Sequence, residues 1–406
     1  MEFNRHTLSN GIRLIHKPVK NLVAHFGFVV HTGSRDELER EHGMAHFIEH
    51  VIFKGTGKRR AWHILSRLED VGGELNAYTS KEDTCIYASF LKGDYNRAME
   101  LISDICFNSK FPEKEINREK GIIIDEILSY KDSPSELIFD EFEELVYNEH
   151  AIGRNILGDE KKLLSFNRDD ISVFINENYA TDEMVLCSVG DIPFSKFIKL
   201  SEKYFGDVKA KSRKRSRIVP NHYDPRTIHS RRNTHQTHCM VGNIAYDALS
   251  DRRTPLALLN NILGGPGMNS RLNISLREKN GYSYNVESHY TAYSDTGLLN
   301  VYFGCDKENY ERSLDLVFRE FRKLREEKLG TLQLTKAKRQ LLGQVAISAD
   351  SNEHMMLSMG KSMLLYDRVD SLEEIRKKIE DISAGDLLEV ANEILDKKRL
   401  SIIQYY

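Results

Sequence analysis

The sequence predicts an α+β protein built from two related domains, and three observations support this prediction. The chain has 406 residues, which is more than one hydrophobic core usually serves. Segments with strand and helix patterns recur in the same order in its two halves, which suggests an internal duplication. A basic stretch with two prolines, residues 209–226, separates the halves. We therefore expect one domain at 1–208, a basic linker at 209–226 and a second domain at 227–406.

The first half contains alternating apolar runs, which predict strands, and longer amphipathic stretches, which predict helices. Gly72-Gly73 interrupts the pattern between a helix and the next strand, and Phe111-Pro112 is typical of a helix start. The expected strands are 11–15, 23–32, 74–79, 84–91 and 184–189, and the expected helices lie around 46–50 and at 61–71, 95–108, 114–130 and 170–178.

The second half repeats this order. Two of its expected helices are separated by Gly264-Gly265-Pro266-Gly267, and, like the first half, it closes with a helix followed by a strand. The expected strands are 237–246, 283–293, 298–305 and 400–405, and the expected helices are 253–263, 270–279, 308–327, 332–348 and 384–394.

Composition narrows the classes of function. The chain carries 58 basic and 61 acidic residues, a net charge of −3, which argues against bulk attraction to nucleic acid or to a membrane surface. Its five cysteines include no C-x-x-C pair, so we expect reduced thiols rather than a disulfide framework or a thiolate zinc site. No signal peptide or membrane-spanning run is visible. These features favour the cytoplasm.

The linker holds a concentrated basic cluster that has two interpretations. A nucleic-acid patch is one of them, but no aromatic residues interleave with the basic ones. We therefore expect a solvated linker. The cluster consists of Lys209, Lys211, Arg213, Lys214, Arg215 and Arg217.

The segment His46-Phe47-Ile48-Glu49-His50 is an H-x-x-E-H box inside a predicted helix. Histidines four residues apart project from the same side of a helix, so both imidazoles can reach one metal ion. Glu49 lies near that face and is free to act as a base. The alternative interpretation is a solvated polar face. A catalytic zinc ion normally takes three protein ligands, so the box needs a third ligand elsewhere in the chain.

Glu119 and Glu126 are candidates for that role. They are seven residues apart in a predicted helix, so their carboxylates point the same way. Two such acids are also common on ordinary helix surfaces, and that interpretation remains open for the pair taken alone.

The box and its flanking sequence, His46 to Thr56, resemble the core of the pitrilysin/insulinase family, an inverzincin group of zinc peptidases. The mitochondrial-processing-peptidase branch of that family typically reads H-F-L-E-H-x-x-F-K-G-T. In this family the third zinc ligand is a glutamate 76 residues after the second histidine, and 50 + 76 corresponds to Glu126. Further similar motifs occur at 72–80 (G-G-x-x-N-A-x-T-S), at 263–272 and at 277–284.

The resemblance implies specific roles. His46, His50 and Glu126 would hold one Zn²⁺, and Glu49 would act as general base and then acid. Glu119 matches a second family carboxylate, which we expect to orient a ligand or assist proton transfer. Its alternative role is that of a helix-surface acid. For the substrate, the resemblance implies an edge strand presented by Asn76 and Ala77, and oxyanion stabilisation by Arg277 and Tyr284.

The resemblance also implies the architecture: one half of a clamshell, with two duplicated domains, each a mainly antiparallel sheet covered by helices. The second half lacks an H-x-x-E-H box, and the His235/His238 pair has no nearby acidic partner, so one zinc per chain is expected. The predicted function is a zinc-dependent endopeptidase that hydrolyses peptides or unfolded segments. We expect a homodimer with composite active sites, with neither nucleic acid nor membrane as partner.

Three alternatives remain from the sequence. A catalytically silent or partner-dependent subunit, similar to processing-peptidase subunits or scaffolds, is the main one. A heterodimer with a paralogue is an alternative to the homodimer, and a metal-binding protein or non-peptidase hydrolase is a third interpretation of the metal site.

Overall fold

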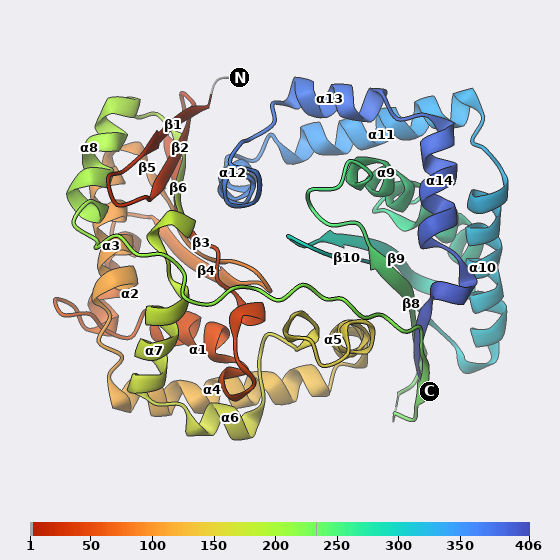
Figure 1. Cartoon of the computed structure of the whole chain (residues 1–406), viewed down its shortest axis with the longest axis horizontal. Coiled ribbons are helices and arrows are strands. Elements are labelled where there is room, and N and C mark those ends of the chain that lie inside the picture. The colour runs from red at the N-terminus through yellow and green to blue at the C-terminus, as the bar shows by residue number, and fades with distance from the viewer. Residues whose placement is uncertain (1–2, 233) are drawn as a thin grey trace. The chain divides into compact units, whose positions relative to one another are not determined.

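The computed structural model describes residues 3–232 and 234–406 and divides into two compact units (Figure 1). Unit 1 comprises Met1–Leu128, Arg154–Arg217 and Ile347–Val369. Unit 2 comprises Ser129–Gly153, Ile218–Ala346 and Asp370–Tyr406. Each unit is a mainly antiparallel sheet covered by helices, which confirms the predicted fold class.

Unit 1 is built on a six-stranded sheet in the order β1-β2-β6-β3-β5-β4. Its pairs are antiparallel except for β2 and β6, which are parallel. The strands are β1 (Asn4–Thr7), β2 (Arg13–Pro18), β3 (Val23–Val30), β4 (Glu74–Thr79), β5 (Thr84–Leu91) and β6 (Met184–Gly190). The helices are α1 (Met44–Val51), α2 (Ala61–Glu69), α3 (Tyr95–Asn108), α4 (Glu113–Lys131), α6 (Glu160–Ser165), α7 (Arg168–Asn178), α8 (Phe194–Phe205) and α12 (Asn352–Tyr366).

Unit 2 repeats this plan on a five-stranded sheet in the order β7-β11-β8-β10-β9, again with one parallel pair, β7 and β11. The strands are β7 (Thr227–Ser230), β8 (Thr237–Ala245), β9 (Ser283–Ala292), β10 (Gly297–Cys305) and β11 (Ser401–Tyr405). The helices are α5 (Pro134–Tyr147), α9 (Arg253–Gly264), α10 (Tyr310–Glu326), α11 (Thr331–Ser348), α13 (Leu372–Glu380) and α14 (Ala384–Ile394). The matching order of β2-β6-β3-β5-β4 and β7-β11-β8-β10-β9 agrees with the predicted duplication.

The expected helix at 270–279 is a π-helix, Asn273–Glu278. A π-helix accommodates one extra residue per turn, and such segments are frequent at functional sites. Seven further elements were not among those expected from the sequence: β1, β7, α5, α6, α8, α12 and α13.

Two helices lie in the unit opposite to their half of the chain. Helix α5 comes from the first half but packs on β8 and β11 of unit 2, whereas α12 comes from the second half and packs on β6 and β3 of unit 1. The compact units therefore differ from the contiguous domains expected at 1–208 and 227–406, because Ser129–Gly153 and Ile347–Val369 change sides.

Both faces of each sheet are apolar, and this explains why α5 and α12 pack in the unit opposite to their half of the chain. In unit 1, Phe26 and Phe28 of β3 join the core beneath α1 and α3, whereas Val29 packs against Met356 and Met359 of α12. Alternate residues of a strand point to opposite faces, so the second face needs its own cover. In unit 2, α5 covers the corresponding face around Met240.

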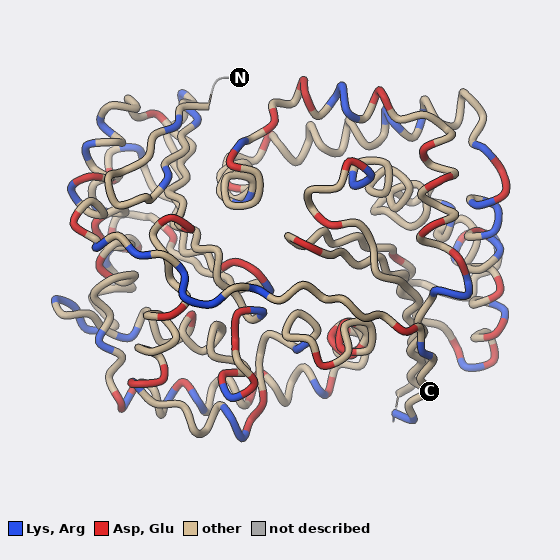
Figure 2. Tube along the Cα trace, viewed as in Figure 1, with Lys and Arg blue, Asp and Glu red and all other residues tan. Residues whose placement is uncertain are grey.

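We expected the linker to be solvated, but its first part packs against unit 1. Arg213, Arg215 and Arg217 alternate along an extended segment and form ion pairs with carboxylates of unit 1. Figure 2 shows basic residues along the trace of the linker. Arg213 and Arg217 both pair with Asp36, whose side chain is 3% exposed. The expectation of a solvated cluster was therefore wrong for these three arginines.

No helix in the described part of the chain is long and apolar enough to cross a bilayer.

Candidate metal centre

Helix α1 carries the H-x-x-E-H box and is anchored by its apolar side. Met44, Phe47, Ile48 and Val51 are fully buried, and this packing leaves the opposite side of the helix for polar groups. The rings of the two box histidines are 4.7 Å apart between centroids. The helical spacing therefore brings the imidazoles together as expected.

Glu126 reaches the two histidines from α4. Its Oε2 lies 3.8 Å from His46 Nε2 and 3.6 Å from His50 Nε2, and the ligand atoms of the three residues all lie within 4.8 Å of one another. Two ligand atoms bound tetrahedrally to zinc at about 2.0–2.1 Å are about 3.4 Å apart. The three side chains therefore fit a zinc ion after small adjustments.

The protonation state of His46 suits metal binding. The side chain is 8% exposed, and burial, with a smaller contribution from His50, lowers the pKa of His46 to about 4. Because a metal ion needs the neutral imidazole, His46 is in the binding form at neutral pH.

Glu119 lies behind the ligands rather than on the helix surface. It is 2% exposed, its Oε2 is 3.4 Å from His50 Nδ1, and its Oε1 is 2.9 Å from Lys54 Nζ. A carboxylate at the far nitrogen of a ligating histidine fixes the tautomer and ring orientation. Glu119 is therefore placed to hold His50 with Nε2 directed toward Glu126.

Glu49 is half-buried and lies beside the end of β4. Burial raises the pKa of its carboxyl group, and the neighbouring Thr79 and His50 oppose this shift. A general base works best when its pKa lies near the working pH. The environment of Glu49 therefore shifts its pKa in the direction that base catalysis at neutral pH requires.

Strand β4, which ends at Thr79, is an edge of the unit 1 sheet. Asn76 pairs with Tyr87 and Ala77 pairs with Ile86 of β5, and no other described strand pairs with β4. Its outer backbone groups are therefore available to an added strand. Glu49 and the predicted substrate strand thus meet at Thr79 within one unit.

Arg277 and Tyr284 belong to unit 2. Arg277 lies in the π-helix, with Nε 3.7 Å from the Glu278 carboxylate. Tyr284 lies on β9, an edge strand of the unit 2 sheet, and is 84% exposed. Both side chains are accessible.

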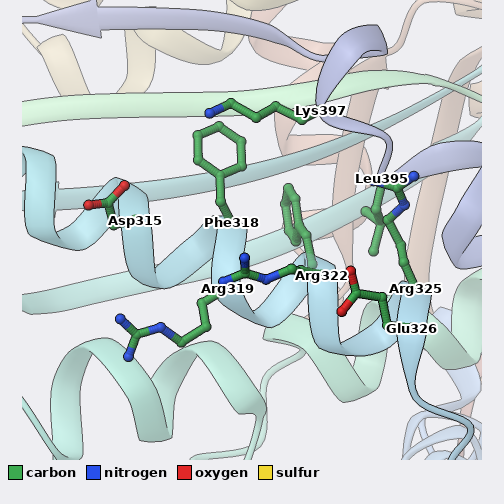
Figure 3. Close-up of a pocket in the computed structure, with 9 residues that line it drawn as sticks. Asp315, Phe318, Arg319, Arg322, Arg325, Glu326, Leu395 and Lys397 are labelled. Carbon is green, nitrogen blue, oxygen red and sulfur yellow. The ribbon is translucent and has the colours of Figure 1, made fainter.

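Unit 2 also has a surface cavity of about 510 Å³ that contains none of the predicted site residues (Figure 3). It is cationic, and the Lys397 ammonium lies 4.6 Å from the centre of the Phe318 ring. Its lining offers no histidine or cysteine, so it does not resemble a zinc site. The lining residues are Asp315, Phe318, Arg319, Phe321, Arg322, Arg325, Glu326, Leu395 and Lys397.

The sequence analysis did not identify Lys54 and Thr79 as neighbours of the site. Lys54 lies beyond the end of α1 at Val51, in the segment His46 to Thr56 that carries the resemblance, and this segment was available as a signal. Thr79 had no comparable signal, because its position next to Glu49 depends on how α1 packs on β4.

The chain is similar to known proteins over most of its length. Residues 13–160 match the family model described as insulinase (peptidase family M16), and residues 165–341 match the one described as the peptidase M16 inactive domain. The chain is 33% identical over 381 residues to the uncharacterized zinc protease YmxG of Bacillus subtilis (strain 168), which covers 93% of this chain and 92% of that protein. It is 30% identical over 403 residues to an uncharacterized zinc protease of Rickettsia felis, with 99% and 97% covered.

Solved structures share the fold at lower identity. A protease from Helicobacter pylori superposes with a TM-score of 0.92 at 20% identity, covering 100% of this chain and 99% of that one. A peptidase M16 inactive domain from Pseudomonas fluorescens gives a TM-score of 0.93 at 20% identity, with 100% and 98% covered. At this identity the likeness concerns the fold alone.

Proposed function

Since the chain belongs to the insulinase family of peptidases, peptidase family M16, we propose that it is a zinc-dependent endopeptidase that hydrolyses peptides or unfolded segments. One observation carries the proposal. Two imidazoles from α1 and one carboxylate from α4 converge, with Glu126 Oε2 within 3.8 Å of both Nε2 atoms. His46, His50 and Glu126 are the proposed ligands of one zinc ion per chain.

When bound by His46, His50 and Glu126, zinc would supply a Lewis acid able to polarise the scissile carbonyl and to lower the pKa of water. Glu49 takes the proton from the attacking water and returns it to the leaving amine. Glu119 accepts a hydrogen bond from His50 Nδ1 and so keeps Nε2 aimed at the ligand set. Lys54 Nζ lies 2.9 Å from Glu119 Oε1 and forms an ion pair with it, which helps to hold Glu119 in place.

An extended peptide adds to the outer edge of β4, along Asn76 and Ala77. Main-chain hydrogen bonds give affinity with little dependence on side chains, which suits an enzyme that accepts unfolded segments. The guanidinium of Arg277 and the phenol of Tyr284 donate to the developing oxyanion. Arg277 and Tyr284 come from a second subunit in the proposed homodimer, and a paralogous subunit is the alternative source. The five cysteines are free and buried, which supports the cytoplasm as the proposed compartment.

Metal analysis together with cleavage of a quenched fluorescent peptide tests the mechanism. We expect wild type to hold one zinc and cleave, and Glu49→Gln to hold zinc but lose activity by about 10²–10⁴-fold. His50→Ala and Glu126→Ala are expected to lose the zinc. Glu69→Gln, an exposed carboxylate on α2, serves as the control and should behave as wild type. Undiminished cleavage by Glu49→Gln would refute the mechanism, and a fully active, stable monomer by light scattering would refute the composite dimer site.

A catalytically silent subunit is the second candidate function. It is favoured by the match of residues 165–341 to a model described as an inactive domain, whereas the ligand set in unit 1 favours an active enzyme. Zinc-loaded protein that cleaves no peptide, alone or mixed with a paralogous subunit, would favour a scaffold.

A further inference from the structure

A buried carboxyl group, that of Glu37, caps the helix that carries the box. Glu37 is 3% exposed, and it accepts hydrogen bonds from the backbone N–H groups of Gly43 at 2.9 Å and Ala45 at 2.8 Å. N–H groups at the start of a helix have no partner within the helix. The Glu37 carboxyl group there satisfies two of them. The start of α1 is therefore held by a side chain from outside the helix.

The backbone just before α1 is tightly packed, because Gly43 lies against Gly158. Gly43 has a φ of +96° and packs against Gly158, which has a φ of +89°. A Cβ atom at Gly43 would lie 2.8 Å from Gly158 Cα, and one at Gly158 would lie 2.6 Å from Gly43 Cα. Only glycine combines this backbone conformation with so close a contact. The two glycines therefore define where the first turn of α1 begins.

The loop that carries Glu37 is itself held by the linker. The adjacent Asp36 accepts hydrogen bonds from Arg213 at 2.6 Å and from Arg217 at 2.9 Å. Arg217 also donates to the Glu82 carbonyl at 2.7 Å. Buried carboxylates that pair with guanidinium groups in this way are strongly held, because loss of one partner leaves a buried charge. The basic linker thus fixes the loop that caps α1.

We propose that Glu37 is a positioning residue for the metal centre, and that the linker arginines support it through Asp36. The inference rests on the proposed function. The proposed ligands come from two helices, His46 and His50 from α1 and Glu126 from α4. A shift of the first turn of α1 therefore changes the distances between the ligand atoms, and metal affinity depends on these distances. Glu37 acts on the metal through this turn and does not touch it.

The same loop offers a matched control. Glu41 is also buried, at 6% exposed, and its carboxylate accepts from the Leu38 N–H at 3.0 Å and pairs with Arg215 at 2.7 Å. It has no described hydrogen bond to α1. Loss of Glu41 therefore perturbs the loop and its stability without releasing the cap of α1.

Zinc affinity measured by chelator competition, together with the visible spectrum of the cobalt-substituted protein, tests the inference. In Glu37→Gln the amide keeps one acceptor and directs an NH₂ group toward the other backbone N–H. We expect zinc affinity to fall by about 10–100-fold, as for residues that orient metal ligands, with an altered cobalt spectrum. Glu41→Gln is expected to lower the melting temperature without changing either readout.

Three results would overturn the inference. They are unchanged zinc affinity in folded Glu37→Gln, an equal loss in Glu41→Gln, and an unchanged cobalt spectrum. If Glu37→Gln does not fold, Arg213→Gln takes its place, because Arg217 still holds Asp36 in that variant. A loss of zinc affinity smaller than that expected for Glu37→Gln would support the inference, and unchanged affinity would overturn it. Wild type without zinc affinity would overturn the proposed function together with this inference, whereas equal affinities of wild type and Glu37→Gln would overturn this inference alone.

Discussion

Glu119→Gln is the most direct test of how the metal centre is organised behind its ligands. The substitution keeps the shape of the side chain but removes its charge. Glu119 Oε2 lies 3.4 Å from His50 Nδ1, and Oε1 lies 2.9 Å from Lys54 Nζ. The neutral amide weakens both interactions, so His50 is less firmly oriented. Partners of metal-bound histidines typically contribute about 10–100-fold to metal affinity, or about 1.4–2.7 kcal/mol.

The assay is zinc dissociation measured by competition with a chromophoric chelator. Glu113→Gln is the matched control, because Glu113 is an exposed carboxylate in the first turn of the same helix and its loss changes the net charge by the same amount. We expect weaker zinc binding in Glu119→Gln and wild-type binding in Glu113→Gln. Equal zinc affinities for Glu119→Gln and wild type would refute the argument that Glu119 orients His50.

Two further predictions concern stability. Burial lowers the pKa of His16 from 6.5 to about 4. As the pH falls through this range, His16 binds a proton in the unfolded state but not in the folded state. The free energy of unfolding therefore decreases between pH 6.5 and about pH 4, by up to about 3 kcal/mol. His16→Phe, which keeps the packing against Phe197, should reduce this pH dependence in denaturant titrations; an unchanged dependence would contradict the assignment. Met359 of α12 is fully buried, so Met359→Ala should lower the free energy of unfolding by about 2–5 kcal/mol. The exposed Ser358→Ala should not, and equal effects of these two substitutions would show that α12 does not cover the unit 1 sheet.

Local spacing was sufficient for the centre of the proposed metal site. An H-x-x-E-H box forms one face of a helix whatever surrounds it, because residues four apart share a side at 3.6 residues per turn. The resemblance to a known family then pointed to Glu126, and α4 brings that carboxylate within 3.8 Å of both imidazoles. Glu49 followed from the same local rule, whereas the role of Glu119 came from the resemblance and stays a prediction.

The sequence by itself determined the α+β class, the repeated element order and the helix faces that meet at the ligands, since these depend on periodicity within short segments. Only the tertiary structure decided which sheet each amphipathic helix covers. An apolar helix face indicates that the helix packs against something, but it does not identify the sheet. The sequence therefore could not assign α5 and α12 to the units in which they lie. The pairing of the linker arginines with Asp36 likewise joins residues far apart in the chain. Their hydrogen bonds depend on where the folded backbone brings each donor, and spacing along the sequence does not encode this.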